Sequence, residues 1–203
     1  MAQKDLVGKY THLPDESLVE IFNEGTREAF VELVHRYQGR LVNFIYRTLG
    51  DIERSEELAQ ESFIRAFRKA DSFNSKYRFS TWIYTIARNL ASNELRDRSR
   101  RPTPYAINDE DWAAANQVSR DARGKATEDP QRRLLDKEMK QALEKALEHL
   151  SQEHRMALIL KEYEGLTYAE IADILDTSAG TVKSWVYRAK REIYKILKEM
   201  GVA

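Results

Sequence analysis

The chain has 203 residues, 42% hydrophobic and 33% charged, which is long enough for one large folded domain or two small ones. It contains no run of about 18 apolar residues, so we expect no membrane-spanning helix and no direct membrane insertion, and its beginning lacks the apolar stretch of a signal peptide. The absence of cysteine excludes disulfides and thiolate metal sites, and 8 glycines and 4 prolines are too few for a β-sandwich. These features predict an all-α protein of the cytoplasm.

The formal net charge is zero, but the charge is unevenly distributed along the chain. Residues 61–101 carry 10 basic and 4 acidic side chains, and the last 23 residues carry 6 basic and 2 acidic. Residues 1–60 carry 7 basic and 11 acidic side chains, and residues 102–130 carry 3 basic and 6 acidic. Two basic blocks separated by acidic ones indicate two places where a polyanion could dock, although solvated helix faces would give the same pattern.

Apolar residues recur at three- and four-residue steps through the first half of the chain, which predicts amphipathic helices. A short helix is expected near Leu18, a helix of about twenty residues is expected to end at Gly50, and another stripe covers residues 58–70. Turn formers at 71–78 precede a third long stripe, which runs out into a cluster of arginines. Side chains expected to face the core include Phe22, Phe63, Phe67, Trp82, Ile86 and Leu90.

No apolar period persists from Pro102 to Pro130, a stretch of about 29 residues that is too long for an ordinary connection. Helices resume after it, with one apolar stripe at 134–150 that includes Met139 and a second that ends at Gly165. The predicted fold is therefore two small helical domains joined by a flexible linker. The expected divisions are a helical bundle at 1–101, the linker at 102–130 and a second helical domain at 131–203.

Residues 166–191 have the pattern of a helix-turn-helix. Thr167 and Glu170 have the spacing of a capping box, and Ser178 can cap a second helix after a short turn. Apolar residues four apart on each helix hold the pair together and leave a basic, polar face on the second helix, which suits the major groove of DNA. An ordinary pair of antiparallel helices is the alternative. The side chains left outward are Lys183, Ser184, Tyr187, Arg188 and Arg191.

Three motifs resemble those of the extracytoplasmic-function (ECF) sigma factors, which are initiation subunits of bacterial RNA polymerase. They are EELAQESFIRAF at 56–67, FSTWIYTIARN at 79–89, and EGLTYAEIA at 164–172 followed by GTVKS at 180–184. The resemblance implies that the first domain is of the region 2 type, which binds core polymerase and melts the promoter −10 element. It implies that the second domain is of the region 4 type, which reads the −35 element.

The resemblance also assigns roles to residues. The polymerase-binding set is Glu57, Gln60, Glu61 and Arg65. The set expected to bind and melt the −10 element is Phe73, Asn74, Lys76, Tyr77, Tyr84, Arg88, Asn89, Asn93, Arg96 and Arg98. Amides, aromatic rings and cations are the groups needed to hold a base outside the stack. The −35 set is Thr181, Lys183, Ser184, Tyr187, Arg188 and Arg191. Asp176 stands where the family usually has glycine, and Trp185 where many members have arginine.

The sequence shows no constellation typical of an enzyme. None of the four histidines has a partner at metal-ligand spacing, and there is no phosphate-binding glycine loop, so no cofactor is expected. The expected partners are core RNA polymerase, through its β and β′ subunits, promoter DNA and an anti-sigma factor, in a response to stress. The alternative function is a stand-alone helix-turn-helix regulator whose first domain dimerises or senses a signal. A third interpretation is an RNA-binding protein, but the sequence contains no recognised RNA-binding module.

Overall fold

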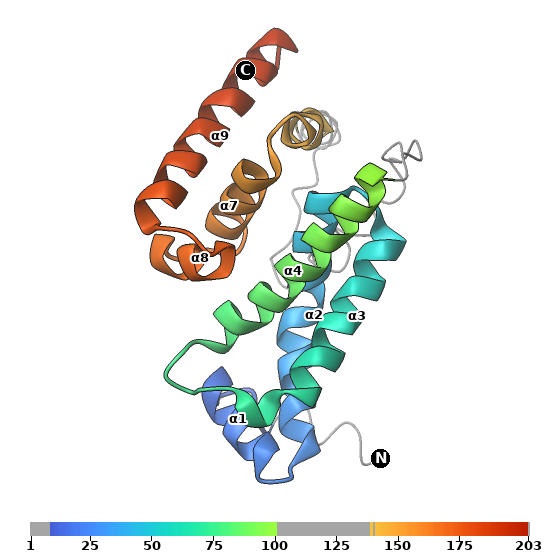
Figure 1. Cartoon of the computed structure of the whole chain (residues 1–203), viewed down its shortest axis with the longest axis vertical. Helices are drawn as coiled ribbons and strands as arrows, with labels where there is room; N and C mark the ends of the chain where they lie inside the picture. The colour runs from blue at the N-terminus through green and yellow to red at the C-terminus, as the bar shows by residue number, and fades with distance from the viewer. Residues whose placement is uncertain (1–8, 101–138, 140, 203) are drawn as a thin grey trace, which may run out of the picture. The chain divides into compact units, whose positions relative to one another are not determined.

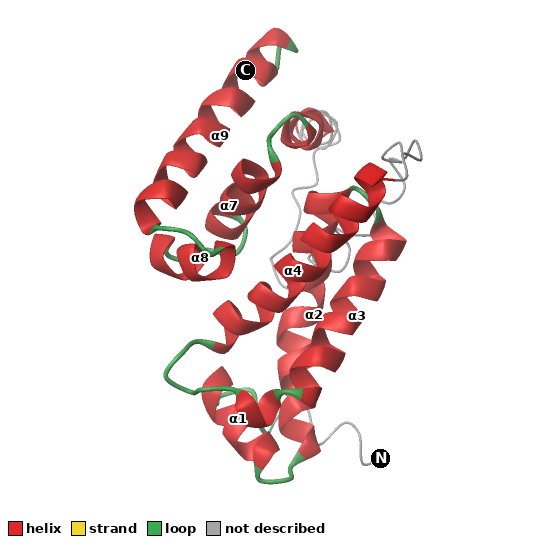
Figure 2. Cartoon of the chain, in the orientation of Figure 1, coloured by secondary structure: helices red, strands yellow, loops and turns green. Residues whose placement is uncertain are grey.

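The computed structural model describes residues 9–100, 139 and 141–202, which form two compact units, one before and one after the intervening segment (Figure 1). Helices are the only regular elements among these described residues, in agreement with the predicted all-α fold (Figure 2). The linker expected at 102–130 lies outside the described residues, so the expected domain boundaries stay a prediction.

The N-terminal unit is built around one long central helix. Its elements are α1 (Asp15–Asn23), α2 (Arg27–Leu49), α3 (Ile52–Arg68), the short 3₁₀ helix η1 (Ala70–Ser72) and α4 (Phe79–Arg100). Helix α2 packs against α1, α3 and α4, and α3 packs against α4, which makes a bundle as the apolar stripes predict. Its largest fully buried side chains are Leu18, Leu33, Leu41, Phe44, Ile45, Phe79, Ile83 and Tyr84.

The turn between α2 and α3 forms where a Gly-Asp pair interrupts the apolar period. Gly50 has a φ of 76°, a left-handed conformation that glycine adopts without steric cost, and its N–H donates to the Tyr46 carbonyl at 2.7 Å. The Asp51 carboxylate then accepts a hydrogen bond of 3.0 Å from the Arg54 N–H and caps α3. The predicted end of the long helix at Gly50 is confirmed.

The C-terminal unit contains a helical stretch at 141–148, followed by α7 (Gln152–Glu162), α8 (Tyr168–Leu175) and α9 (Ala179–Glu199). Helix α7 packs against both α8 and α9, and α8 packs against α9. The core between these helices is aliphatic. Its fully buried side chains include Met156, Ile159, Leu160, Ile171 and Val182.

Five of the expected core positions are only partly covered, and the half-buried Phe22 is one of them. Phe67, in the last turn of α3, is 45% exposed, because it lies at the end of the bundle against the ring of Phe22. Trp82 and Ile86 are half-buried, since they lie on the flank of α4 and not on the centre of its apolar face. Met139 is 42% exposed, so the stripe expected in the second domain does not reach the core at this position.

Candidate nucleic-acid interface

A polar face of α3 points to solvent. Glu57 and Gln60 are exposed, and the Glu61 carboxylate pairs with the Arg65 guanidinium, one turn further along the helix, at 2.7 Å. The opposite face of α3 is apolar and packs on α2 and α4. This polar face is the one for which the sequence predicts polymerase binding, and its position leaves it accessible to a partner.

The segment between η1 and α4 presents polar and aromatic side chains. The side-chain oxygen of Asn74 accepts a hydrogen bond from the Lys76 N–H at 3.0 Å, and the Asn74 carbonyl accepts one from the Tyr77 N–H at 3.0 Å. All three side chains are exposed, Tyr77 to 63%. Phe73 is half-buried, with its ring centroid 5.1 Å from that of Trp82. Such a segment can stack on unpaired bases and attract their phosphates.

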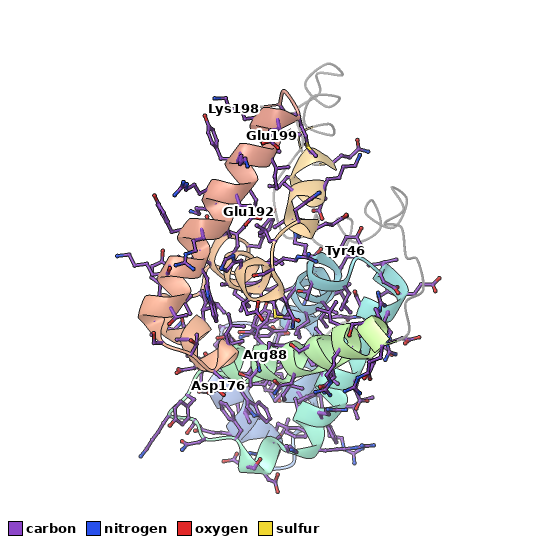
Figure 3. The ribbon with its side chains drawn as sticks, turned by 45° about the horizontal axis from the view of Figure 1, so that its top comes forward. Tyr46, Arg88, Asp176, Glu192, Lys198 and Glu199 are labelled. Carbon is purple, nitrogen blue, oxygen red and sulfur yellow. The ribbon has the colours of Figure 1, made fainter. Side chains whose placement is uncertain are left out.

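Helix α4 carries a line of amides and cations on its outward side. Asn89, Asn93 and Arg96 are exposed and recur at steps of four and three residues, so they share one face. The Arg88 guanidinium donates to the side-chain oxygen of Asn89 at 2.9 Å, and Arg96 donates to that of Asn93 at 3.0 Å (Arg88 is labelled in Figure 3). Each amide therefore lies beside a cation, a combination that can hydrogen-bond a base edge and hold the neighbouring phosphate.

Tyr84 lies in the core, unlike the other expected residues of the −10 set. It is fully buried, and its ring makes edge contacts with Phe44 at 5.4 Å and Tyr37 at 6.5 Å between centroids. The ring could stack on a base only if α4 separated from α2. This placement removes Tyr84 from the candidate DNA contacts and makes it a packing residue.

Arg98 is also directed into the N-terminal unit. Its guanidinium pairs with the Asp51 carboxylate at 2.7 Å and with Glu94 at 3.0 Å, while Glu94 also pairs with Arg54 at 2.8 Å. Burial alone would raise the pKa of the Glu94 carboxyl, but the hydrogen bonds from Arg98 and Arg54 outweigh it, so this pKa lies below its ordinary value. The Arg98 side chain therefore links α4 to the start of α3, and we no longer count it among the candidate phosphate contacts.

A signal for both corrections is present in the sequence. Tyr84, Ala91 and Arg98 follow one another at seven-residue intervals, which places them on one face of a helix. Ala91 is buried in the bundle. The spacing therefore indicates that Tyr84 and Arg98 point inward, while Asn89 and Arg96 lie on the opposite side.

The predicted helix-turn-helix is confirmed in the C-terminal unit. The Thr167 hydroxyl accepts a hydrogen bond from the Glu170 N–H at 3.3 Å, and the Glu170 carboxylate accepts one from the Thr167 N–H at 2.7 Å, which completes the capping box. Asp176 has a φ of 55° and ends α8 in the left-handed conformation that aspartate tolerates better than most residues (Figure 3). The Ser178 hydroxyl accepts from the Thr181 N–H at 3.0 Å and caps α9.

The N-terminal half of α9 presents the basic face expected for DNA. Lys183, Tyr187, Arg188 and Arg191 are exposed, Tyr187 to 66%, while Val182, Val186 and Ala189 are buried against the other helices. Ser184 is half-buried, and the hydroxyl of Thr181, also half-buried, lies 2.8 Å from that of Ser178 within the cap. Three cations and a phenol over about two turns can meet phosphates and base edges of a major groove. The first residue of this set, Thr181, is engaged in starting the helix.

Trp185 does not lie with the basic set. Its side chain is half-buried, and its ring centroid is 6.4 Å from that of His154 on α7. The departure from the arginine of many family members thus replaces a candidate DNA contact by a packing contact between α9 and α7. Nothing in the sequence around Trp185 indicates His154 as its neighbour.

The described residues also bear on two other classes of site. No helix among them is long and apolar enough to cross a bilayer. No three histidine, aspartate or glutamate side chains within the described part of the chain come together in a group that could hold a metal ion.

Comparisons with known proteins identify the family of both units. Residues 33–101 match the family Sigma-70 region 2, and residues 140–193 match Sigma-70, region 4. The chain is 36% identical over 190 residues to RNA polymerase sigma-H factor of Pseudomonas aeruginosa, covering 94% of this chain and 97% of that protein. It is 37% identical over 183 residues to ECF RNA polymerase sigma-E factor of Escherichia coli K12, covering 89% and 93%.

A solved structure gives the same result. The co-crystal structure of the sigma factor RpoE with the anti-sigma factor NepR from Bartonella quintana matches with a TM-score of 0.63 at 25% identity, covering 83% of this chain and 96% of that one. Matches to both regions leave no role for the alternative of a stand-alone regulator with an unrelated first domain. The chain belongs to the sigma-70 family and is an RNA polymerase sigma factor of the extracytoplasmic-function group.

Proposed function

We propose that the two units divide promoter recognition between them, and that the N-terminal unit opens the −10 element. Asn89 hydrogen-bonds a base that has left the stack, Tyr77 and Phe73 supply aromatic surface, and Arg88 and Arg96 hold phosphates. The support is the exposure of these groups on one loop and one side of α4, except for the half-buried Arg88 and Phe73. Asn74, Lys76 and Asn93 extend the same surface.

The C-terminal unit grips intact duplex at the −35 element through α9. Lys183, Arg188 and Arg191 neutralise phosphates or contact base edges, and Tyr187 adds apolar contact in the groove. The support is that these side chains are exposed on a helix whose start is fixed by its cap at Ser178. Ser184 and Thr181 are half-buried, so they present less surface to the DNA than the four exposed side chains do.

The polar face of α3, at Glu57, Gln60, Glu61 and Arg65, binds the β and β′ subunits of core polymerase. Its exposure supports this role, and charged pairs along such a face would set the orientation of docking. In this assignment residues 1–101 form the region 2 domain, residues 102–130 the linker and residues 131–203 the region 4 domain. The protein itself catalyses no reaction, because nucleotide chemistry belongs to the polymerase, and it acts in the cytoplasm where that enzyme works.

An anti-sigma factor holds the protein inactive until a stress signal releases it. The support is that the solved relative RpoE was crystallised with the anti-sigma factor NepR. The measurement is transcription by core polymerase with this protein and increasing amounts of a candidate anti-sigma protein. A candidate that binds both units and blocks initiation supports the proposal, and one that binds without reducing transcription contradicts it.

The observation that carries the proposal is the outward line on α4, from the 73–78 segment to Arg96. Amides and cations beside exposed aromatic rings supply the hydrogen bonds, stacking surface and phosphate contacts that an extruded base requires. The test is run-off transcription with core polymerase over a promoter library, with core polymerase alone as the control. We expect RNA that starts at defined sites only when the chain is present. Random starts, or no RNA, would contradict the proposal.

A further inference from the structure

Helix α1 is firmly attached to α2 through a cluster of hydrogen bonds. The Arg36 guanidinium pairs with the Asp15 carboxylate at 2.6 Å and also donates to the carbonyls of Leu13 and Tyr10 at 2.8 and 2.9 Å. The Tyr37 hydroxyl donates to the other oxygen of Asp15. Burial raises the pKa of this hydroxyl and the Asp15 carboxylate raises it further, so the hydroxyl remains a donor. The start of α1 is therefore fixed relative to the centre of the bundle.

Two side chains of α1 reach the segment that carries the candidate −10 residues. The Glu16 carboxylate accepts a hydrogen bond from the Phe79 N–H at 3.0 Å, at the first residue of α4. The Asn23 side-chain amide donates to the Ala70 carbonyl at 2.9 Å, at the first residue of η1. The two contacts join residues 63 and 47 positions apart in the chain. One helix thus holds both ends of the 70–79 segment.

The chain needs an external acceptor at the start of α4. A helix usually begins after Ser, Thr, Asp or Asn, whose side-chain oxygen satisfies an N–H of the first turn. Arg78 precedes α4, and its guanidinium has no acceptor to offer. The Glu16 carboxylate supplies an acceptor there, with a negative charge that suits the positive end of the helix dipole.

The hydrogen bonds inside the 73–78 segment are local. They run from Lys76 and Tyr77 to Asn74, and they shape the turn without fixing its distance from α4. The ring of Phe73 contacts that of Trp82 on α4, and the hydrogen bonds of Glu16 and Asn23 tie the two ends of the segment to α1. A group that binds an extruded base does so faster when it is already held in position. Small displacements of such a group therefore lower the rate of opening.

We infer that Glu16 and Asn23 are positioning residues for promoter opening, which hold the 70–79 segment in the geometry that captures the unpaired −10 strand. The inference rests on the proposed role of that segment. Neither side chain touches DNA in this scheme. Loss of either hydrogen bond leaves the basic face of α9 and the polar face of α3 unchanged, so recruitment to the promoter persists while strand opening slows.

The experiment compares isosteric variants in the full-length protein bound to core polymerase. Glu16→Gln keeps an acceptor oxygen, whereas Glu16→Ala removes it, and Asn23→Asp keeps the shape but removes the donor. Glu20→Gln, at an exposed position of the same helix, is the matched control. Three quantities are measured: the rate at which promoter thymines become reactive to permanganate, the affinity of the closed complex, and the midpoint of thermal unfolding.

We expect Glu16→Ala and Asn23→Asp each to slow opening about five- to tenfold, with closed-complex affinity within about twofold of the parent. Glu16→Gln and Glu20→Gln should open at nearly the parent rate. Opening at the parent rate in both Glu16→Ala and Asn23→Asp would overturn the inference. Equal slowing in Glu16→Gln and Glu16→Ala, or a loss of opening that only follows a lower unfolding midpoint, would overturn it as well.

Direct variants of the segment separate this inference from the proposed function. Tyr77→Ala and Lys76→Ala remove exposed side chains that are expected to meet the single strand. If both slow opening while the Glu16 and Asn23 variants do not, the inference fails and the proposed function stands. If neither affects opening, the role proposed for the segment fails, and the inference fails with it.

Discussion

The two surfaces that we propose to contact DNA are held in place in different ways. The basic face of α9 lies on a regular helix whose start is fixed by Ser178. The Ser178 hydroxyl accepts a hydrogen bond from the N–H of Thr181, three residues further along the chain. The 73–78 segment of the N-terminal unit is irregular, and the contacts at its ends come from Glu16 and Asn23, far away in the sequence. One surface is specified locally, and the other depends on the packing of the whole bundle.

This difference fits the two tasks. A helix that enters a major groove needs little more than its own regularity, because the duplex it reads is already formed. A surface that receives an extruded base has to exist before the base arrives, and an irregular segment achieves this only with external support. We therefore expect damage to the N-terminal bundle to abolish opening while the grip on the duplex survives.

The largest effect should come from Tyr84→Ala, which should destabilise the N-terminal unit and leave the stability of the C-terminal unit unchanged. Removal of a fully buried ring that contacts Phe44 and Tyr37 should lower the free energy of unfolding of this unit by about 3–5 kcal/mol. Hydrogen exchange of each unit gives the measurement. Tyr77→Ala, at an exposed tyrosine of the same unit, is the control and should cost less than about 0.5 kcal/mol. Similar losses in the two variants would contradict the placement of Tyr84.

The next effect concerns the C-terminal surface. The double variant Lys183→Ala, Arg188→Ala should weaken promoter binding by the holoenzyme about 30- to 100-fold and lower the slope of log affinity against log salt by about 2, because two phosphate contacts disappear. Lys190→Ala, Lys195→Ala removes two cations of the same helix that pair with Glu162 and Glu199, and serves as control. A salt slope that is the same in both double variants would refute the assignment of the face.

Asn89→Ala should act on opening alone. Loss of the exposed amide on α4 should slow the appearance of permanganate-reactive bases about tenfold, while binding to core polymerase and to the −35 element stays unchanged. Ser99→Ala, at an exposed position further along α4, is the control. If the footprint of the Asn89 variant develops as fast as that of the parent, the base does not bind there.

The smallest effect is the pH dependence of the Glu94 network. The pKa of Glu94 in the folded protein lies below its ordinary value of about 4.3. The ionised Glu94 carboxylate therefore stabilises the folded protein fully above about pH 4.3, and this contribution disappears as the pH falls through the lowered pKa. Glu94→Gln should lower the free energy of unfolding by about 1 kcal/mol from pH 7 to 5, and this difference should shrink below about pH 4.

The control for this measurement is Glu53→Gln, at an exposed position of α3. It should show no comparable difference from the parent at any pH. A difference between Glu94→Gln and the parent that persists undiminished to pH 3 would show that the carboxylate is not the group responsible.

Sequence reasoning succeeded where partners are close along the chain. The capping box of Thr167 and Glu170, the cap at Ser178 and the turn at Gly50 involve residues within four positions of one another, so spacing alone predicts them. Asp176, which stands where the family usually has glycine, adopts a left-handed conformation of the kind that glycine adopts at helix ends. The capped starts of α8 and α9 and the turn between them could thus be predicted from the sequence.

Contacts between distant residues could not be predicted in this way. No periodicity links Glu16 to Phe79 or Asn23 to Ala70, because each bond depends on how α1 packs on the bundle. Arg98 is an intermediate case. Its inward direction follows from helical spacing, but its partner Asp51 is 47 residues away, and the cluster of neighbouring arginines favoured the interpretation as a phosphate contact.

The support that α1 gives has a practical consequence for dissecting the protein. The match to region 2 begins at residue 33, after α1 has ended, so a fragment cut at that boundary would retain all its signature motifs. It would nevertheless lack the carboxylate and the amide that tether the 70–79 segment. Fragments meant for binding single-stranded oligonucleotides should therefore begin before Tyr10, whose carbonyl is the first group of the Arg36 cluster along the chain.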